Sequence, residues 1–375
     1  MRAASPDQRP AHDVPSPRDI RRAVEGFSRR GLLGLGGMMG LAALTACTDG
    51  ADDTKKQASG TSAGAADMRA AYSTIGAGSG STWEARGVDS AKLFGDLLGV
   101  QVEVFDGKFS PEKQRRDLEQ IASRQFDFVA VHAGAINAFV DPVKELLGKG
   151  VPVIQMDTRI ADDAAKLDVT TFIEPDNVYM GETMATLLFQ ELGGSGEVIH
   201  TQGQLTHTGA QLRGEGFKRA AAKFPGIKVV DESPGNWSAD ETLKLWQNLL
   251  VKFPGVKGGY FHNDDMALAA YTATKSAGRD GAVKLVGIDG MQPACEAVDK
   301  GQLLGSVVNP TGRIHGTAMW IGYLLKTKKI DSVPKYIRAD GGVRLRNGDR
   351  LMPDPVLVGR NRDKLEALAR AHGVE

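Results

Sequence analysis

The chain has 375 residues, of which 41% are hydrophobic and 25% are charged, and its 46 Lys and Arg residues balance 46 Asp and Glu residues. That length suffices for two domains with a sizeable buried core. The charge balance argues against a nucleic-acid partner, which usually requires a basic surplus. The two cysteines, Cys47 and Cys295, are too few for a disulfide framework or a thiolate-rich metal site.

Residues 1–46 are predicted to be an export signal. Arg29 and Arg30 precede an uncharged run of mostly small and apolar residues that is too short and glycine-rich for a membrane span. This order is typical of a twin-arginine signal. The stretch "LTAC" resembles a bacterial lipobox, which implies that Cys47 is lipidated; the alternative is a plain signal peptide with an incidental cysteine. The small polar residues of 47–67 indicate a flexible tether.

From residue 68 onward, apolar strand-like runs alternate with amphipathic helical stretches in two successive series. The runs span 69–75, 100–105, 126–132, 151–156 and 169–174, then 196–203, 226–232, 257–263, 283–289 and 303–309. Strands that alternate with helices favour parallel sheets with helices on both faces. The sequence therefore predicts an α/β protein with two similar Rossmann-like lobes.

We expect three segments to join the lobes as a hinge, near Asn177, Asn309 and Val333. The predicted first lobe comprises 68–175 and 310–333, the second comprises 176–309 and 334–360, and 361–375 form a C-terminal helix or tail. Open α/β sheets bind ligands beyond the carboxyl ends of their strands. Several predicted strands end in polar residues, namely Asp106, Asp157, Asn263, Asp289 and Asn309. A ligand site is therefore expected in the cleft between the lobes.

The glycine-rich stretch "AYSTIGAGSGSTWEARG", residues 71–87, follows the first predicted strand and suggests a dinucleotide-binding loop, with Asp106 as the ribose-binding acid. That fingerprint requires a third glycine or alanine where Ser81 stands, and Asp106 fits equally well as a polar cap on its strand. We therefore favour a loop whose glycines let the backbone approach a ligand. It brings Trp83 into the cleft, with the hydroxyls of Ser79, Ser81 and Thr82 nearby.

Four stretches then follow in an order and spacing that resemble the ribose-type sugar-binding proteins of bacterial ABC importers. They are "VPVIQMDTR" (151–159), "GAQLRGEGFKRA" (209–220), "YFHNDDMALAA" (260–270) and "LVGIDG" (285–290). The resemblance covers roughly residues 68–328. It implies a periplasmic-binding-protein-like type I fold, a monomer and no cofactor. The same family includes sensor domains of sugar-responsive repressors, but this chain has no helix-turn-helix head and carries an export signal.

The resemblance implies a set of polar ligand-binding residues. Asp157 and Asp289 supply carboxylates that accept hydrogen bonds from ligand hydroxyls, and the guanidinium of Arg213 donates to a pair of ligand oxygens. Asn263 offers a donor and an acceptor from one amide. Asn309 stands at a lobe crossing where relatives often have glutamine.

Trp83 and Trp237 match positions where relatives usually have aromatic rings that stack on a sugar. Two departures from the family pattern add three residues to the predicted site. Many relatives have an arginine directly after the aspartate, whereas here Thr158 comes first and Arg159 follows. Glu84 stands where relatives often have a second aromatic. These departures favour a more polar pocket, with a ligand that is smaller or richer in hydroxyls.

Other polar and aromatic residues are predicted to have structural roles. Asp176 and Asn177 suit a helix cap, and Asp264 and Asp265 suit a first helical turn, where the helix dipole favours acids. Trp246 lies in an apolar helical pattern and is expected in the core. The histidines have no familiar metal-ligand spacing, so no metal site is predicted; His207 is a candidate to face the cleft.

Together these features predict a solute-binding protein that is not an enzyme. It binds a monosaccharide or polyol and delivers it to ABC permease subunits, from a lipid anchor on the outer face of the cytoplasmic membrane. The sequence contains no phosphate-binding loop motif. Three alternatives remain open: a sugar-sensing receptor, a binder of a nucleoside or furanosyl signal, and a secreted carbohydrate-active or NAD-dependent enzyme.

Overall fold

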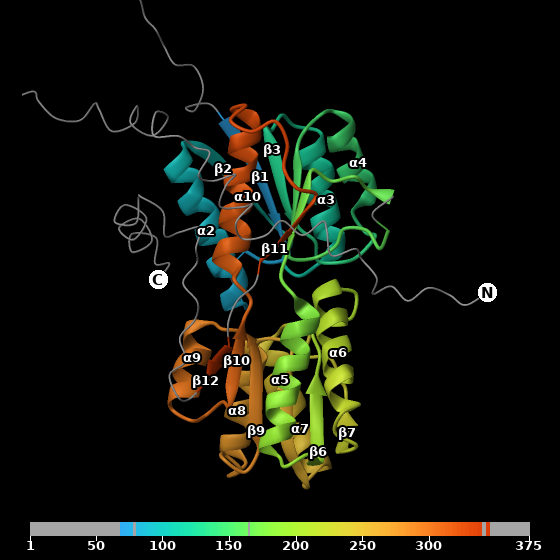
Figure 1. Cartoon of the computed structure of the whole chain (residues 1–375), viewed down its shortest axis with the longest axis vertical. Helices are drawn as coiled ribbons and strands as arrows, with labels where there is room; N and C mark the ends of the chain where they lie inside the picture. The colour runs from blue at the N-terminus through green and yellow to red at the C-terminus, as the bar shows by residue number, and fades with distance from the viewer. Residues whose placement is uncertain (1–67, 78–79, 164–165, 340–342, 346–375) are drawn as a thin grey trace, which may run out of the picture. The chain divides into compact units, whose positions relative to one another are not determined.

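The computed structural model describes residues 68–77, 80–163, 166–339 and 343–345 (Figure 1), all within one compact unit, Ala65–Glu375. The predicted signal, the tether, Cys47, Ser79 and the C-terminal tail lie outside the described residues. Among the residues that are described, no helix is both long and apolar enough to cross a membrane.

The first lobe is built on a six-stranded sheet in the order β11-β5-β4-β3-β1-β2, and every neighbouring pair is parallel. Its strands are β1 (Met68–Thr74), β2 (Val100–Asp106), β3 (Phe128–His132), β4 (Val153–Met156), β5 (Thr171–Glu174) and β11 (Tyr336–Arg338). Its helices are α2 (Thr82–Leu98), α3 (Pro111–Ala122), α4 (Val140–Gly148) and α10 (Thr311–Lys326). Helix α2 packs against α10, and α3 packs against α4.

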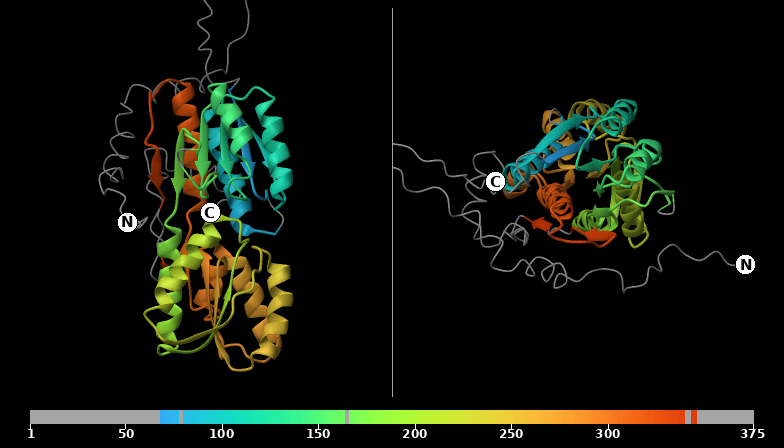
Figure 2. Two further views of the ribbon diagram at one scale, coloured as in Figure 1. Left: turned by 90° about the vertical axis from the view of Figure 1, so that its right-hand side faces the viewer. Right: turned by 90° about the horizontal axis from the view of Figure 1, so that it is seen from above.

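The second lobe repeats this plan with a six-stranded sheet in the order β12-β10-β9-β8-β6-β7. Its strands are β6 (Ser195–Thr201), β7 (Gly226–Asp231), β8 (Val256–Phe261), β9 (Lys284–Asp289), β10 (Gly305–Val308) and β12 (Val343–Leu345). Its helices are α5 (Asn177–Glu191), α6 (Thr208–Ala221), α7 (Ala239–Lys252), α8 (Asp264–Ser276) and α9 (Gln292–Asp299). Helices lie on both faces of each sheet (Figure 2). The predicted two-lobed α/β fold is therefore confirmed.

The structure departs from the predicted parallel sheets and lobe boundaries near residues 334–345. Strand β11 pairs with β5 in the first sheet, although residues 334–360 were expected in the second lobe. The last crossing therefore lies beyond Arg338 and not at Val333. Strand β12 then joins the second sheet antiparallel to β10. A three-residue strand has too short an apolar run to show in sequence which sheet it joins.

Burial of strands on both faces explains their continuous apolar runs. All five residues of β3 are buried. Trp246 is fully buried as predicted, and its indole Nε1 donates to Thr201 Oγ1 at 2.8 Å. The predicted caps also form: Asp176 accepts from the backbone N–H of Tyr179 at the start of α5. Local capping thus fixes where helices begin at the lobe crossing.

Helices α5 and α6 cross at two glycines, Gly181 and Gly216. A Cβ at Gly181 would clash with the carbonyl oxygen of Arg213, and one at Gly216 with that of Val178. Both neighbours are backbone atoms that cannot rotate away. The crossing therefore requires glycine on both helices, and it sets the position of Arg213.

We expect Gly216→Ala to lower the free energy of unfolding by about 1–3 kcal/mol, because overpacking displaces one helix from the other. Urea unfolding measures the change. Gly148→Ala is the matched control, since a Cβ there meets no heavy atom within 4 Å and alanine favours a helix. Equal stability of the two variants would contradict this account of the α5–α6 crossing.

Candidate functional site

Strand ends and helix starts of both lobes surround a cavity of about 320 Å³, counting the part open to solvent. The cavity is lined by Ile75, Ser81, Trp83, Glu84, Phe109, His132, Asp157, His207, Arg213, Trp237, Asn263, Asp289 and Asn309. The fold thus gathers most of the predicted site residues around one space.

Thr158 and Arg159 are the two predicted residues that do not line the cavity. Thr158 is buried, and its hydroxyl donates to the carbonyl oxygen of Ala133 at 2.7 Å. The guanidinium of Arg159 lies 3.9 Å from the Glu174 carboxylate. Asp157 has a left-handed backbone (φ 55°) that turns the chain directly after β4, so the next two side chains point elsewhere.

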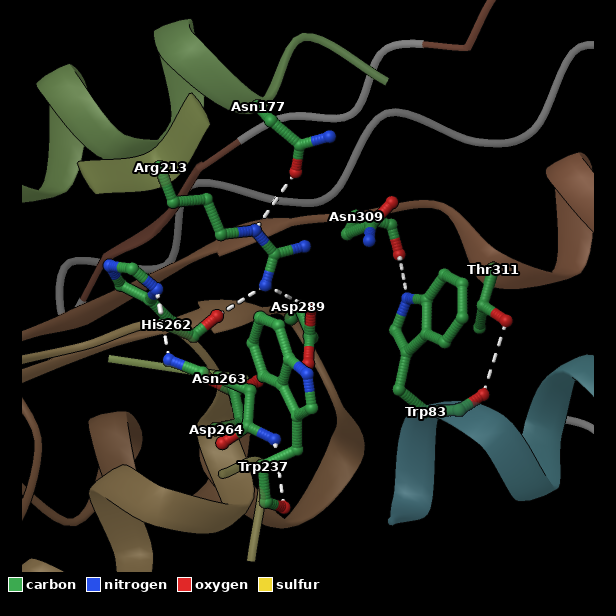
Figure 3. A network of polar contacts seen from close by, with 12 residues as sticks. Trp83, Asn177, Arg213, Trp237, His262, Asn263, Asp264, Asp289, Asn309 and Thr311 are labelled. Atoms are coloured by element: carbon green, nitrogen blue, oxygen red, sulfur yellow. Dashed lines mark hydrogen bonds and ion pairs between the residues drawn. The ribbon is translucent and has the colours of Figure 1, made fainter. Parts of the chain in front are cut away.

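The guanidinium of Arg213 holds several elements of the site together (Figure 3). Its Nε donates to Asn177 Oδ1 at 2.9 Å, and its Nη1 donates to the His262 carbonyl and to Asp289 Oδ1, the latter at 3.3 Å. It also lies over the ring of Trp237, 5.6 Å from the centroid. Asn177, predicted only as a cap residue, thus orients the guanidinium at the lobe crossing.

Two of the expected ligand groups of the second lobe, Asn263 and Asp289, differ in whether their polar atoms are free to contact a ligand. Asn263 caps α8: its Oδ1 accepts from the backbone N–H of Met266 at 2.9 Å, and its Nδ2 donates to the Trp237 carbonyl at 3.4 Å. Its amide is therefore mostly engaged within the protein. Burial raises the pKa of Asp289 well above its ordinary value, although the Arg213 charge opposes this shift. The side chain of Asp289 faces the cavity and can contact a ligand.

The two tryptophans come from opposite lobes. Trp83 lies in the first turn of α2, and its Nε1 donates to the Asn309 carbonyl at 3.1 Å. The Trp237 indole is also buried, but no described residue accepts from its Nε1. Trp237 has a left-handed backbone (φ 65°), which projects its ring from the loop before α7.

A buried ionic group at the first-lobe wall centres on His132, which the sequence analysis did not assign to the site. Its Nδ1 lies 3.1 Å from Glu84 Oε1 and its Nε2 lies 3.5 Å from Asp157 Oδ2. Burial disfavours a charged imidazole, but the two carboxylates outweigh it and raise the pKa of His132 to about 10. Burial also opposes ionisation of Asp157, and the His132 charge nevertheless holds its pKa below the usual range.

His132 could have been identified by the pattern that identified Asp157, namely a polar residue at the end of a predicted strand. His132 is the last residue of β3, at the same edge of the sheet, and it pairs with Met156 directly before Asp157. The candidate His207 does face the cavity. Phe109 and Ile75 complete the wall, and no local pattern marks them because they come from loop and strand ends.

Several polar atoms at or beside the cavity are buried without a hydrogen-bond partner among the described residues. They include Trp237 Nε1, Asn309 Oδ1, Asn177 Nδ2 and both ring nitrogens of His207 and of His132, whose carboxylate neighbours lie at ion-pair distance. Native proteins rarely leave buried polar groups unpaired, because each costs free energy. In addition, Asp157, Trp237 and Asp289 have positive φ angles, and such strain concentrates at functional sites.

The glycine-rich loop leads to Trp83 at the cavity wall, as expected, and its described residues are held by structural contacts. Asp106 Oδ1 accepts from the backbone N–H groups of Ala77 and Lys108, so it ties the loop to β2. A Cβ at Gly76 would clash with the ring of Phe109, so this glycine lets the loop approach Phe109. Ser81 caps α2 through the backbone N–H of Glu84, at 3.4 Å. The loop therefore positions Trp83 and Glu84 through the start of α2.

Hydrogen bonds join the lobes around the cavity. Thr82, the first residue of α2, donates from its backbone N–H and its hydroxyl to the carboxylate of Asp265, at 2.9 and 3.0 Å. Asp265 lies in the first turn of α8, as predicted. One carboxylate therefore meets the positive ends of two helices, one from each lobe. Further bonds between the lobes are Arg159 N to Thr208 Oγ1, Ile136 N to Thr206 O and Gln204 Nε2 to Phe109 O.

Behind the cavity wall, two histidines form a hydrogen-bond chain. The Gly203 N–H donates to His262 Nδ1 at 3.1 Å, so His262 carries its proton on Nε2. That Nε2 lies 2.8 Å from Nε2 of His200, whose Nδ1 lies 2.9 Å from Glu232 Oε1. Burial lowers the pKa of His200 to about 4 and that of His262 well below its ordinary value.

The family profile described as a periplasmic binding protein domain matches residues 73–329, and the chain belongs to this family. A xylitol-binding protein from Mycolicibacterium smegmatis is 29% identical over 226 residues, which cover 60% of this chain and 63% of that protein. A ribose import binding protein from Salmonella typhimurium is 29% identical over 245 residues, covering 65% and 81%. The alignment with the xylitol-binding protein thus spans less than two thirds of that relative.

Solved structures show the same fold. A solute-binding protein from Actinobacillus succinogenes with bound D-allose has a TM-score of 0.66 and 23% identity, covering 75% of this chain and 98% of that chain. A galactofuranose-binding protein has a TM-score of 0.71 and 21% identity, covering 81% and 99%. The predicted periplasmic-binding-protein type I fold is therefore confirmed.

We expect Asp265→Ala to favour separation of the lobes, because it removes the carboxylate that bridges Thr82 and α8. Small-angle X-ray scattering without ligand should give a larger radius of gyration than for the unchanged protein. Asp240→Ala is the matched control: it removes an exposed acid from the first turn of α7, where no contact between lobes is lost. The same radius in all three proteins would contradict the proposed role of this contact.

We expect the free energy of unfolding to fall as the pH drops from about 6.5 to about 4, since the unfolded chain protonates histidines that the folded state keeps neutral. One such group contributes a slope of about 1.4 kcal/mol per pH unit. His200→Gln should reduce the slope by about that amount, measured by urea unfolding at several pH values. An unchanged slope would show that His200 is protonated in the folded state.

Proposed function

We propose that this protein is the solute-binding component of an ABC importer and that it binds a neutral monosaccharide or polyol in the cavity. Family membership supports the general role. Relatives named for binding xylitol and ribose support the ligand class. Those relatives are named as binding proteins, in keeping with a chain that is not an enzyme.

The observation that carries the proposal is the set of unpaired polar atoms on residues of the cavity wall. Trp237 Nε1 is a donor and Asn309 Oδ1 is an acceptor. Burial lowers the pKa of His207 to about 3, so its neutral imidazole offers one of each. A polyhydroxy ligand can satisfy all of them, since each hydroxyl both donates and accepts. The rings of Trp83 and Trp237 supply apolar area against the C–H faces of such a ligand.

The charges around the cavity favour a neutral ligand. His132 lies between Glu84 and Asp157, and Arg213 lies beside Asp289, so the cations already have carboxylate partners. An anionic ligand would compete with these carboxylates, and a cationic one would repel Arg213 and His132. Ligand recognition therefore rests on hydrogen bonds and ring contacts.

The two lobes provide a mechanism for capture and release. A ligand that contacts groups of both lobes favours the closed arrangement, because only that arrangement makes all its contacts. The closed protein then docks on the permease subunits in the membrane. An export signal in 1–46 and lipidation at Cys47 keep the protein at the outer face of the membrane, and it acts as a monomer.

We expect one class of compound in a ligand panel to raise the melting temperature, because binding to the folded state alone stabilises it. The panel comprises pentoses, hexoses, polyols, inositols, nucleosides and NAD, and isothermal titration calorimetry then gives the affinity. Asp289→Ala and Arg213→Ala should each weaken binding roughly 10- to 100-fold, from loss of hydrogen bonds to charged groups worth about 1.5–3 kcal/mol.

Asp280→Asn is the matched control, since Asp280 is exposed and does not line the cavity. It should bind the ligand as the unchanged protein does. A melting shift with NAD alone would contradict the proposal and favour the dinucleotide interpretation of the glycine-rich loop. Conversion of the bound sugar to a product would favour a carbohydrate-active enzyme.

A further inference from the structure

Three buried side chains with metal-ligating atoms meet at the cavity wall, although the sequence spacing indicated no metal site. One donor atom from each of His132, Asp157 and His207 lies within 4.8 Å of the others. The exposed fractions of the three residues are only 1%, 3% and 4%. His132 and Asp157 follow neighbouring strands of the first sheet, whereas His207 precedes α6 in the second lobe. The residues are far apart in sequence, so only the fold brings them together.

A carboxylate lies beside the ring nitrogen of His132 that points away from Asp157, as is usual for histidines that bind metals. Its Nδ1 lies 3.1 Å from Glu84, on the side opposite the nitrogen that faces Asp157. Glu84 is in turn fixed by a hydrogen bond from the Thr74 hydroxyl. Histidines that bind metals usually donate their other ring N–H to a carboxylate, which orients the ring and raises its basicity. Glu84 supplies that second carboxylate here.

His207 is free to bind through either ring nitrogen. It occupies the N-cap position of α6 but makes no side-chain capping bond, and both nitrogens are buried without a partner among the described residues. A buried imidazole with no other partner is a ready ligand for a metal ion.

We propose that His132 Nε2, Asp157 Oδ2 and His207 bind a divalent transition-metal ion of the zinc class at the cavity wall. Two imidazoles and one carboxylate suit Zn²⁺, Co²⁺, Ni²⁺ or Cu²⁺, whereas Mg²⁺ and Ca²⁺ prefer all-oxygen sites. Tetrahedral bonds of about 2.0–2.2 Å place donor atoms roughly 3.3–3.6 Å apart. The donors here lie within 4.8 Å of one another, so the most distant ones must approach by up to roughly 1.5 Å. Three protein ligands leave a fourth position open toward the cavity.

The site links the two lobes, and all three of its residues also line the cavity of the proposed ligand site. A bound ion ties His207 of the second lobe to two residues of the first, and therefore favours the closed arrangement. Asp157 Oδ1 still accepts from Asn309 Nδ2 at 3.1 Å, so only its second oxygen turns to the metal.

The test uses Co²⁺ as a spectroscopic probe and Zn²⁺ in calorimetry, on the purified protein freed of metal with a chelator. We expect one ion per chain, and the intense visible absorption of four- or five-coordinate Co²⁺. His207→Ala should abolish that absorption. Glu84→Gln leaves all three ligands in place but should weaken binding about 10- to 100-fold, the usual effect of losing a supporting carboxylate.

His200→Gln is the control, because His200 is equally buried but lies outside the cluster; it should bind Co²⁺ unchanged. Circular dichroism checks that each variant is folded. Absence of the Co²⁺ absorption in the unchanged protein, or its persistence in a folded His207→Ala variant, would overturn the proposal. Metal binding and sugar binding are measured separately, so failure of the metal site leaves the proposed transport function intact, and the reverse also holds.

Discussion

The structure of the site depends on pairing and hydrogen-bonding one buried cation, the guanidinium of Arg213. The side chain of Arg213 is 4% exposed, and a guanidinium removed from water must be paired and hydrogen-bonded to avoid a large cost. Its partners come from the lobe crossing (Asn177), the end of β8 (His262) and the end of β9 (Asp289). The same group lies over Trp237. A single electrostatic requirement thus fixes several parts of the second-lobe wall.

The first-lobe wall also contains a buried cationic group that must be paired, and this group is an imidazole. His132 lies between Glu84 and Asp157, so two carboxylates and one imidazole replace the guanidinium. Thr158, directly after Asp157, turns its hydroxyl to the Ala133 carbonyl. The positive charge near Asp157 comes instead from His132 on the neighbouring strand.

Closure of the cavity rests on contacts that are mostly between backbone groups and short side chains. Asp265 bridges two helix starts, and the remaining bonds between lobes involve loop residues such as Thr206 and Thr208. Such contacts are individually weak, so the balance between open and closed arrangements is sensitive to a ligand. This sensitivity suits a protein that must both capture and release its cargo.

The sequence by itself determined the two-lobed α/β fold and the polar strand ends. These features follow from local physics: buried parallel strands need continuous apolar runs, and their carboxyl ends point to one edge. Other residues of the cavity wall, such as Arg213 and Trp83, were expected only because four stretches of the sequence resemble a family of sugar-binding proteins. Local patterns also placed Trp246 in the core and Asp176 at a helix cap.

Only the tertiary structure decided the rest. Strand β11 is too short to reveal which sheet it joins, and Thr158 and Arg159 lie beyond a left-handed turn that redirects their side chains. Asn263 proved to be a cap because its amide lies beside backbone groups of α8 and the Trp237 loop. The grouping of His132 with His207 joins positions 75 residues apart in the chain, from different lobes. Packing of the two lobes brings these residues together, and the spacing of residues in the sequence does not predict it.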